Sequence, residues 1–414
     1  MSWRVEQWIA AELGDKPSAE QLRRLIGLVD AKLAAQLEAI VHSPPFKQLE
    51  GAWRGLKFLV DQASGAEAPV EVRVLNVSAD ELRGDLEAAP EVEQTCLWRE
   101  VENGFALGRP CSLLVFAGGI GPGGDELLLW QYLALVGAAW QTPVLADADA
   151  SILGLEDWTQ LSTIRGSILE QAAGPTHAAW RSFREKEDAA YAALFLPPVR
   201  ARAPHQTSAF AWEESRAHVP WMQAGMVVAA ALVRNFAAEG IRFHEPAPED
   251  AIVPTPTGAE CRLAVEISDR RAADFAKLGL TPLWPVPGTL QASVGRWSTC
   301  YRPPSYHDAQ VQAAADLMTR FDLLLTLTSF ARGVMWQARR HRLARASVAD
   351  MQPQLQQWLD QYVATPAAPE RPLAHAQVKL GKTEAHRPMP PLQVELQLRG
   401  VPPWPALRLA LEIP

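Results

Sequence analysis

The stretch between Cys111 and Asp149 constrains the fold more than any other part of this 414-residue chain. It opens with the apolar run CSLLVFAGG, continues with the helix-like run DELLLWQYLALVGAAWQ and closes with PVLADAD. Two short apolar runs joined by one helix are typical of a strand–helix–strand unit, whose strands lie parallel in one sheet. We therefore expect an α/β (α+β) protein with a mixed sheet flanked by helices.

The loop inside this unit, GGIGPGGDE, raises the question of a phosphate site. Glycines after a strand let backbone N–H groups approach an anion at the start of a helix. The spacing fits neither G-x-G-x-x-G nor G-x-x-x-x-G-K-[ST], and Asp125 and Glu126 would repel a phosphate. A plain loop is favoured, and an α/β enzyme with an anion-binding loop at 118–124 is the alternative.

Three helices are predicted before the first strand, of which the first is a short one over Met1 to Gly14. Ser18 and Gln21 fit a capping box, and an apolar stripe at helical spacing follows from Leu22 to Ile40. The next helix lies in HSPPFKQLEGAWRGLKFLV, where Ser43 and a proline suit a helix start. Steps of three and four predict one buried face, while Glu50, Arg54 and two lysines face elsewhere. The residues of that face are Phe46, Leu49, Trp53, Leu56 and Val60.

Further along the chain, EVRVLNVS (71–78) alternates like a strand, and Ser78 opens a helix. The longest helix is predicted over about 307–337. A charged run, RSFREKEDAAYAALFLPP, contains Arg181, Arg184, Glu185 and Asp188. Charges of both signs on a helix most often form a solvated or salt-bridged face. The alternative is a specific function, a catalytic carboxylate pair.

The last forty residues contain three alternating strands after the proline-rich linker ATPAAPERP. Strands set off in this way must find a sheet to join, and edges that the chain leaves unpaired are sites where another chain can add a strand. We expect a C-terminal β-strand module completed by other subunits. Its apolar residues are Val394, Leu396, Leu398, Leu407, Leu409, Leu411 and Ile413.

These patterns divide the chain into three regions: an N-terminal helical region 1–64, an α/β core region 65–365 with any subdomain boundary near 200–220, and the C-terminal strand module 366–414. The net charge of −8 argues against a nucleic-acid partner. No apolar run reaches the ~18–20 residues that span a bilayer. The four cysteines lie far apart and the histidines form no H-E-x-x-H, so we expect neither a metal, a cofactor nor a catalytic triad.

The stretch HSPPFKQLEGAWRGLKFLV resembles the signature of the large sheath subunit of bacterial type VI secretion systems, the TssC (VipB) family. Further resemblances follow in order: WRSFREKEDAAYAALFLP, ISDRRAADFAKLGLTPL, the helix with LLLTLTSFA, and the terminal RPLAHAQVKLGK to LRLALEIP. The resemblance runs from about residue 20 to residue 414. It makes residues 46–56 a family-signature core rather than a reactive site.

The resemblance implies a cytoplasmic bacterial structural protein, without catalysis, that works by contraction. In that family the large subunit folds with a small partner, TssB (VipA-like), and the pairs stack in helical rings around an inner tube of Hcp, with baseplate components at the end. Strand exchange between subunits ties the rings together. A non-contracting sheath-like paralogue is a further alternative. The short region before the signature counts against engagement by a ClpV-like disassembly ATPase.

Overall fold

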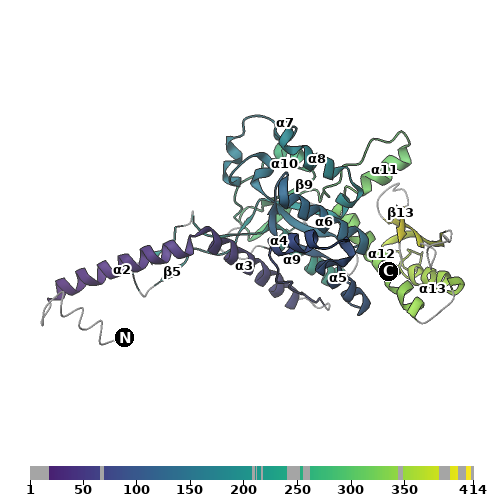
Figure 1. The fold of residues 1–414 in the computed structure, drawn as a ribbon, viewed down its shortest axis with the longest axis horizontal. Helices are drawn as coiled ribbons and strands as arrows, with labels where there is room; N and C mark the ends of the chain where they lie inside the picture. The colour runs from purple at the N-terminus through teal and green to yellow at the C-terminus, as the bar shows by residue number, and fades with distance from the viewer. Residues whose placement is uncertain are drawn as a thin grey trace.

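The computed structural model describes residues 18–65, 70–207, 210, 212–215, 218–239, 252–254, 262–343, 348–381, 392–399 and 407–411. The short helix predicted over Met1 to Gly14 lies outside these residues. Figure 1 shows three parts: a helix that projects from one side, a central α/β body, and a small sheet with a helix at the opposite side. We call the projecting helix, α2 (Ala19–Val41), the arm. It joins α3 (Pro44–Ser64), which runs along the body.

The body is built on a six-stranded mixed sheet in the order β1-β2-β3-β9-β10-β8. Its first four strands are parallel and the last two pairings are antiparallel. The first pairing aligns Leu114 with Val144, as a strand–helix–strand unit requires. The mixed sheet predicted from the sequence is therefore confirmed. The strands are β1 (Leu114–Ile120), β2 (Val144–Ala148), β3 (Ala192–Leu196), β8 (Ile252–Pro254), β9 (Leu280–Pro285) and β10 (Gln291–Val294).

Two apolar helices, α6 (Gly124–Trp140) and α9 (Ala224–Glu239), pack against strands β1 to β3. Both bury residues on several sides of the helix, as their nearly continuous apolar sequences require. The carboxylate of Asp147 in β2 accepts the backbone N–H groups of Ala224 (2.8 Å) and Gly225 (2.7 Å) at the start of α9. Burial raises the pKa of Asp147 to about 7, against these two hydrogen bonds.

Shorter elements surround this core. The remaining helices are α4 (Ala79–Ala88), α5 (Cys96–Ala106), α7 (Ile168–Gln171), α8 (Ala178–Arg184), α10 (Asp269–Lys277), α11 (Ala309–Leu317), α12 (Phe321–Leu343) and α13 (Val348–Asp360). The 3₁₀ helices are Val92–Gln94, Ala150–Leu153, Trp158–Thr163, Pro175–His177 and Glu187–Tyr191. Two-residue strands form two small pairs, β4 (Val199–Arg200) with β7 (Trp221–Met222) and β5 (Gln206–Thr207) with β6 (Trp212–Glu213).

The long helix predicted over 307–337 is two helices, α11 and α12, and the prediction of one helix is wrong. The break falls where the backbone makes sheet-like hydrogen bonds: Thr299 N–H donates to Thr319 O, and Phe321 N–H donates to Trp297 O. Ser298 and Arg320 form an antiparallel bridge between them. These tertiary hydrogen bonds outweigh a local helical preference that is continuous in the sequence.

The strand predicted at 71–78 is also wrong, because residues 70–78 pair with no described strand. Val74 and Leu75 are more than half exposed, so the alternating pattern lacks a sheet to cover it. The helix start at Ser78 is confirmed: its hydroxyl accepts the N–H of Glu81, and the Glu81 carboxylate accepts the N–H of Ser78. The capping box of Ser18 and Gln21 is confirmed in the same way.

The three C-terminal strands are present as predicted, β11 (Leu373–Leu380), β12 (Leu392–Leu398) and β13 (Leu407–Leu411). They form one antiparallel sheet in the order β11-β12-β13, with α13 packed on β11. Val394 and Leu396 of β12 are 1% exposed, so this sheet has a core of its own.

Candidate functional site

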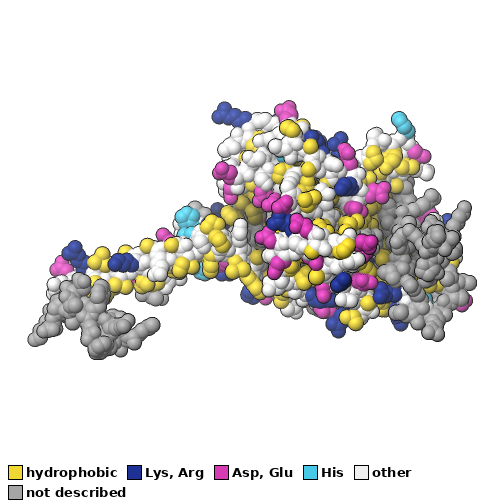
Figure 2. Space-filling view, in the orientation of Figure 1, with side chains coloured by type: hydrophobic (Ala, Val, Ile, Leu, Met, Phe, Trp, Pro, Cys, Tyr) yellow, Lys and Arg dark blue, Asp and Glu magenta, His cyan; other side chains and the backbone are white. Residues whose placement is uncertain are grey.

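The arm carries an apolar surface that the other described residues leave open. Its apolar residues recur at helical spacing, yet each is more than a third exposed, up to 58% for Ile26. Figure 2 shows hydrophobic side chains along the length of the arm. Monomeric proteins rarely expose contiguous apolar surface of this kind unless a partner covers it. We call this set the arm stripe: Leu22, Ile26, Val29, Leu33 and Ile40.

The face of α3 that the sequence predicts to be buried is exposed, and that prediction is wrong. Phe46 is 38% exposed, Leu49 56% and Trp53 62%, while Leu56 is half-buried. Val60 is 39% exposed. We call Phe46, Leu49, Trp53 and Val60 the α3 stripe; like the arm stripe, it has no cover among the described residues.

The buried face of α3 is the other one, formed by Gly51, Gly55, Phe58 and Leu59. It packs against α9 and β7. The two glycines allow the helix to approach closely: a Cβ on Gly51 would lie 2.2 Å from the backbone oxygen of Trp221. Because glycine has no Cβ, Gly51 and Gly55, one helical turn apart, let β7 and α9 approach the backbone of α3 closely. The signal for the correct face was therefore two small residues, which an apolar pattern does not show.

A buried ion cluster joins α3 to the body beside the arm. Arg202 is 3% exposed, and each of its five N–H groups has an acceptor. Nε and Nη2 donate to the carboxylate of Glu50 (2.6 and 3.1 Å). Nη1 and Nη2 donate to the carboxylate of Glu214, and Nη1 also donates to Ala203 O (3.1 Å). Arg54 donates to Glu50 from the exposed side (2.7 Å).

The electrostatics of this cluster keep both carboxylates charged. Burial opposes ionisation of Glu214, but hydrogen bonds from Arg202 and from the His205 N–H outweigh it and lower its pKa to about 2. Burial also opposes ionisation of Glu50, and hydrogen bonds from Arg202 and Arg54 lower its pKa nonetheless. Fully hydrogen-bonded fork-to-carboxylate pairs are the strong form of ion pair. We call Glu50, Arg202 and Glu214 the joint cluster.

The sequence identified Glu50 and Arg54, but not the other two members of the joint cluster, Arg202 and Glu214. Glu214 lies in residues 204–219, which the sequence predicts to be an irregular connection. Arg202 comes just before that stretch and 152 residues after Glu50. No local spacing relates these residues, so only the tertiary structure brings them together.

The four residues of the charged run have separate surroundings. Arg184 is 7% exposed, and its Nε donates to Cys300 O (2.9 Å), so the expectation of a solvated face is wrong for this residue. Burial lowers its pKa to about 10. Arg181 donates to backbone carbonyls, and Glu185 is exposed. Burial raises the pKa of the half-buried Asp188.

The C-terminal strands pair within their own chain to a larger extent than the sequence suggests. β12 is paired on both sides, with β11 and with β13. Leu398 is half-buried, and Leu407, Leu409 and Leu411 lie in β13, opposite residues of β12. Ile413 lies outside the described residues. Among the described strands, β13 pairs only with β12, so no described strand lies along its other edge.

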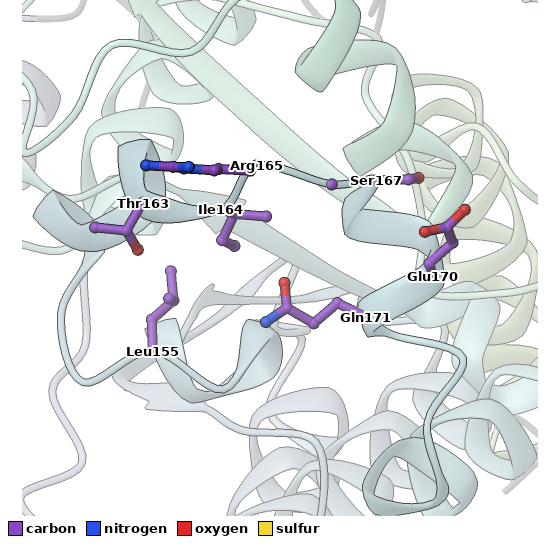
Figure 3. Close-up of a pocket in the computed structure, with 8 residues that line it drawn as sticks. Leu155, Thr163, Ile164, Arg165, Ser167, Glu170 and Gln171 are labelled. Carbon is purple, nitrogen blue, oxygen red and sulfur yellow. The ribbon is translucent and has the colours of Figure 1, made fainter.

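In the glycine loop after β1, a carboxylate from the start of α6 occupies the place where an anion would bind. The carboxylate of Glu126 accepts the N–H of Gly121 (3.0 Å), the position that a bound phosphate would need. A hollow of about 470 Å³ lies at residues 155–171 (Figure 3). None of the residues that line it is buried, and Arg165 and Glu170 do not converge on a common point. Neither feature resembles an active site, in which a few polar groups converge in a cavity.

In the described part of the chain, no three His, Cys, Asp or Glu side chains are grouped so that they could hold a metal ion. None of the described helices is long and apolar enough to cross a bilayer.

The fold and its open surfaces define an α/β subunit suited to assembly with other chains. Residues 23–296 match the VipB family, described as EvpB/VC_A0108, tail sheath N-terminal domain, and the chain belongs to this tail sheath family. It is 29% identical over 401 residues to the type VI secretion system sheath protein TssC1 of Pseudomonas aeruginosa, covering 89% of this chain and 80% of that protein. The resemblance to the TssC/VipB family inferred from the sequence is confirmed.

A solved structure is also similar to the chain. It is the cryo-EM structure of the anti-feeding prophage baseplate, matched at 12% identity and a TM-score of 0.40 over 72% of this chain and 68% of that one.

Proposed function

We propose that this chain is a non-enzymatic structural subunit of a type VI secretion contractile sheath, located in the bacterial cytoplasm. The single observation that carries the proposal is the pair of open apolar surfaces, the arm stripe and the α3 stripe, on a member of the tail sheath family. The proposed division is 1–64 for partner binding, 65–365 for the sheath core and 366–414 for links between subunits.

The occupant proposed for the two stripes is a helix of a small sheath subunit similar to TssB (VipA). The arm has 23 residues, which makes it about 35 Å long at roughly 1.5 Å per residue. A surface of that length with anchors three and four residues apart fits an amphipathic helix laid along it. Loop or strand partners would not match this spacing.

Copies of the same chain are the occupants proposed for the other edge of β13. Main-chain hydrogen bonds at such an edge give affinity without requiring a particular sequence, which suits a repeating assembly. Successive rings would then be tied together through β13. An Hcp-like inner tube and baseplate components complete the proposed set of partners, and contraction of the assembled tube ejects the inner tube.

The first experiment is co-expression with the small sheath subunit, followed by affinity purification and electron microscopy. The double variant Ile26→Ser, Leu33→Ser is expected to lose the small subunit and to form no tubes. The matched control is Leu107→Ser, Leu128→Ser, because these two leucines are at least as exposed but lie outside both stripes. Equal recovery of the small subunit with both double variants would refute the proposed surface.

The second experiment deletes residues 392–414 from the same co-expressed pair. We expect the small subunit to be retained and tubes or ring stacks to be absent, because the deletion removes β12 and β13, and with them the edge proposed to link subunits, but not the stripes. Images of extended and shortened tubes of the intact pair then separate a contracting sheath from a sheath-like paralogue that does not contract.

The competing interpretation, an α/β enzyme with an anion-binding loop at 118–124, has less support. Glu126 already accepts the N–H of Gly121, so an incoming phosphate would have to displace a carboxylate. Nucleotide binding that is lost on changing Gly121 and Gly123 to Val would favour this alternative over the sheath.

A further inference from the structure

The direction of the arm is not set by packing of its apolar face. The arm stripe is exposed, and α2 leaves the body so that its far end touches no other described element (Figure 1). Contacts with the body come at the near end, where α2 ends at Val41 and α3 begins at Pro44. Whatever holds this joint therefore holds the whole arm.

Three side-chain contacts cross the joint from the segment that carries β5 and β6. His42, the C-cap of α2, lies 3.4 Å from the carboxylate of Glu214 through its Nε2. The rings of His42 and His218 are 4.6 Å apart. Trp212 Nε1 donates to the carboxylate of Glu38 (3.3 Å). The segment that carries β5 and β6 therefore contacts the last turn of the arm. We call its described residues, 205–207, 210, 212–215 and 218, the bracket.

Arg202 links the bracket to α3, and His205 Nε2 also lies 3.9 Å from the Glu50 carboxylate. Arg202 holds the Glu50 carboxylate from α3 on one side of its guanidinium and the Glu214 carboxylate from the bracket on the other. Glu214 in turn accepts the N–H of His205 (2.8 Å). One planar, five-donor group thereby ties α3 to the bracket, and the bracket holds the last turn of α2 through Glu214 and Trp212.

We propose that Arg202 is a positioning residue that sets the direction in which the arm leaves the body, and with it the place where a partner helix docks. This rests on the proposed function in one respect only, that the arm is the partner surface. A lysine at this position would keep the charge but could not donate in pairs to two carboxylates, so the bracket and α3 would no longer share one geometry.

The test measures the arm in the isolated chain. Spin labels are attached through an unnatural amino acid at positions 24 and 87, which are exposed on the arm and on α4, so that the native cysteines stay unlabelled. Arg202→Lys is expected to shift or widen the distance distribution between the labels. Arg54→Lys is the matched control, since Arg54 also pairs with Glu50 but is 37% exposed and touches no bracket residue in the described contacts. Its distribution should equal that of the unmodified chain.

Binding of the small subunit is the second measurement. Arg202→Lys is expected to raise the Kd about tenfold, within the range typical of coupling between two sites. An Arg202→Lys chain that loses stability but keeps the original distance distribution overturns the proposal, because the residue is then merely structural. If Arg202→Lys does not fold, Glu214→Gln serves instead, since it keeps the shape of the side chain and removes one carboxylate charge. An unchanged distance distribution in Glu214→Gln overturns the proposal as well.

The two proposals fail in different ways. If the distance distribution changes and the Kd does not, Arg202 positions the arm but the arm is not the partner surface, and the proposed function of the arm is wrong. If Ile26→Ser, Leu33→Ser abolishes binding while Arg202→Lys changes neither distance nor Kd, the arm is the partner surface and the positioning role is wrong.

Discussion

The arm helix α2 and the body helix α9 are both long helices with apolar residues on their surfaces, yet they have opposite surroundings. Val227 and Val228 of α9 are fully buried between the sheet and α3, whereas Ile26 and Leu33 of α2 are about half exposed. The difference teaches that helical periodicity identifies a face that needs cover without saying which molecule covers it. In the body the chain supplies the cover, and in the arm another chain is proposed to do so.

The largest expected effect tests this contrast directly. Phe195 is fully buried, with its ring 6.0 Å from Trp297 and 6.3 Å from Phe321. Phe195→Ala should lower the free energy of unfolding by about 3–5 kcal/mol, from lost burial and a cavity. Ile26→Ala should change it by less than about 0.5 kcal/mol, as exposed positions do. Urea denaturation of the isolated chain measures both, and similar losses would mean that the chain covers its own arm.

The second prediction uses pH, because the two regions contain buried carboxylates with opposite pKa shifts. The folded pKa of Glu214 at the joint is lowered from 4.5 to about 2. It therefore adds stability above about pH 5, on the order of 3 kcal/mol, which is lost as the pH falls towards 2. The folded pKa of Asp147 in the body is raised from 3.8 to about 7. Its contribution to the free energy of unfolding is on the order of 4 kcal/mol. That contribution is fully present below about pH 4 and is lost as the pH rises through 7.

The matching variants separate the two effects. Glu214→Gln should flatten the acid side of a plot of unfolding free energy against pH, and Asp147→Asn should flatten the side between pH 4 and 7. If both variants keep the slopes of the unmodified chain, the two carboxylates are not the groups responsible.

The third prediction compares two glycines. A Cβ on Gly51 in α3 would meet the backbone oxygen of Trp221 at 2.2 Å, while a Cβ on Gly27 in the arm would meet nothing within 4 Å. Gly51→Ala should destabilise the chain by about 1–3 kcal/mol, the usual cost of overpacking. Gly27→Ala should make the arm helix more stable by up to about 1 kcal/mol. Chemical denaturation measures the effect of Gly51→Ala, and the helical circular dichroism signal measures the effect of Gly27→Ala. Stabilisation by Gly51→Ala would show that α3 does not pack against β7.

What the sequence could predict was local, and what it missed was tertiary. The capping boxes at Ser18 and Ser78 and the strands around Leu114 and Val144 depend on neighbours in sequence, and they are present in the structure. The buried face of α3 could not be found in this way, because Gly51 contributes to it by being small. The joint cluster depends on pairing across 152 residues, which no periodicity encodes.

The smallest effect concerns the two capping boxes, which have the same hydrogen-bond pattern, Ser18 with Gln21 in the arm and Ser78 with Glu81 in the body. Ser78 begins α4 in the body, so Ser78→Ala should lower the global free energy of unfolding by about 1 kcal/mol. Ser18 begins the arm, whose first turns touch nothing else in the described chain, so Ser18→Ala should fray the start of α2 and leave global unfolding unchanged. Hydrogen exchange resolved along the sequence distinguishes the two: protection should fall only over the first turns of α2 in Ser18→Ala. Adding the small subunit should restore that protection if the arm is its binding surface, whereas an arm that keeps fraying in the complex would confine the partner to the α3 stripe.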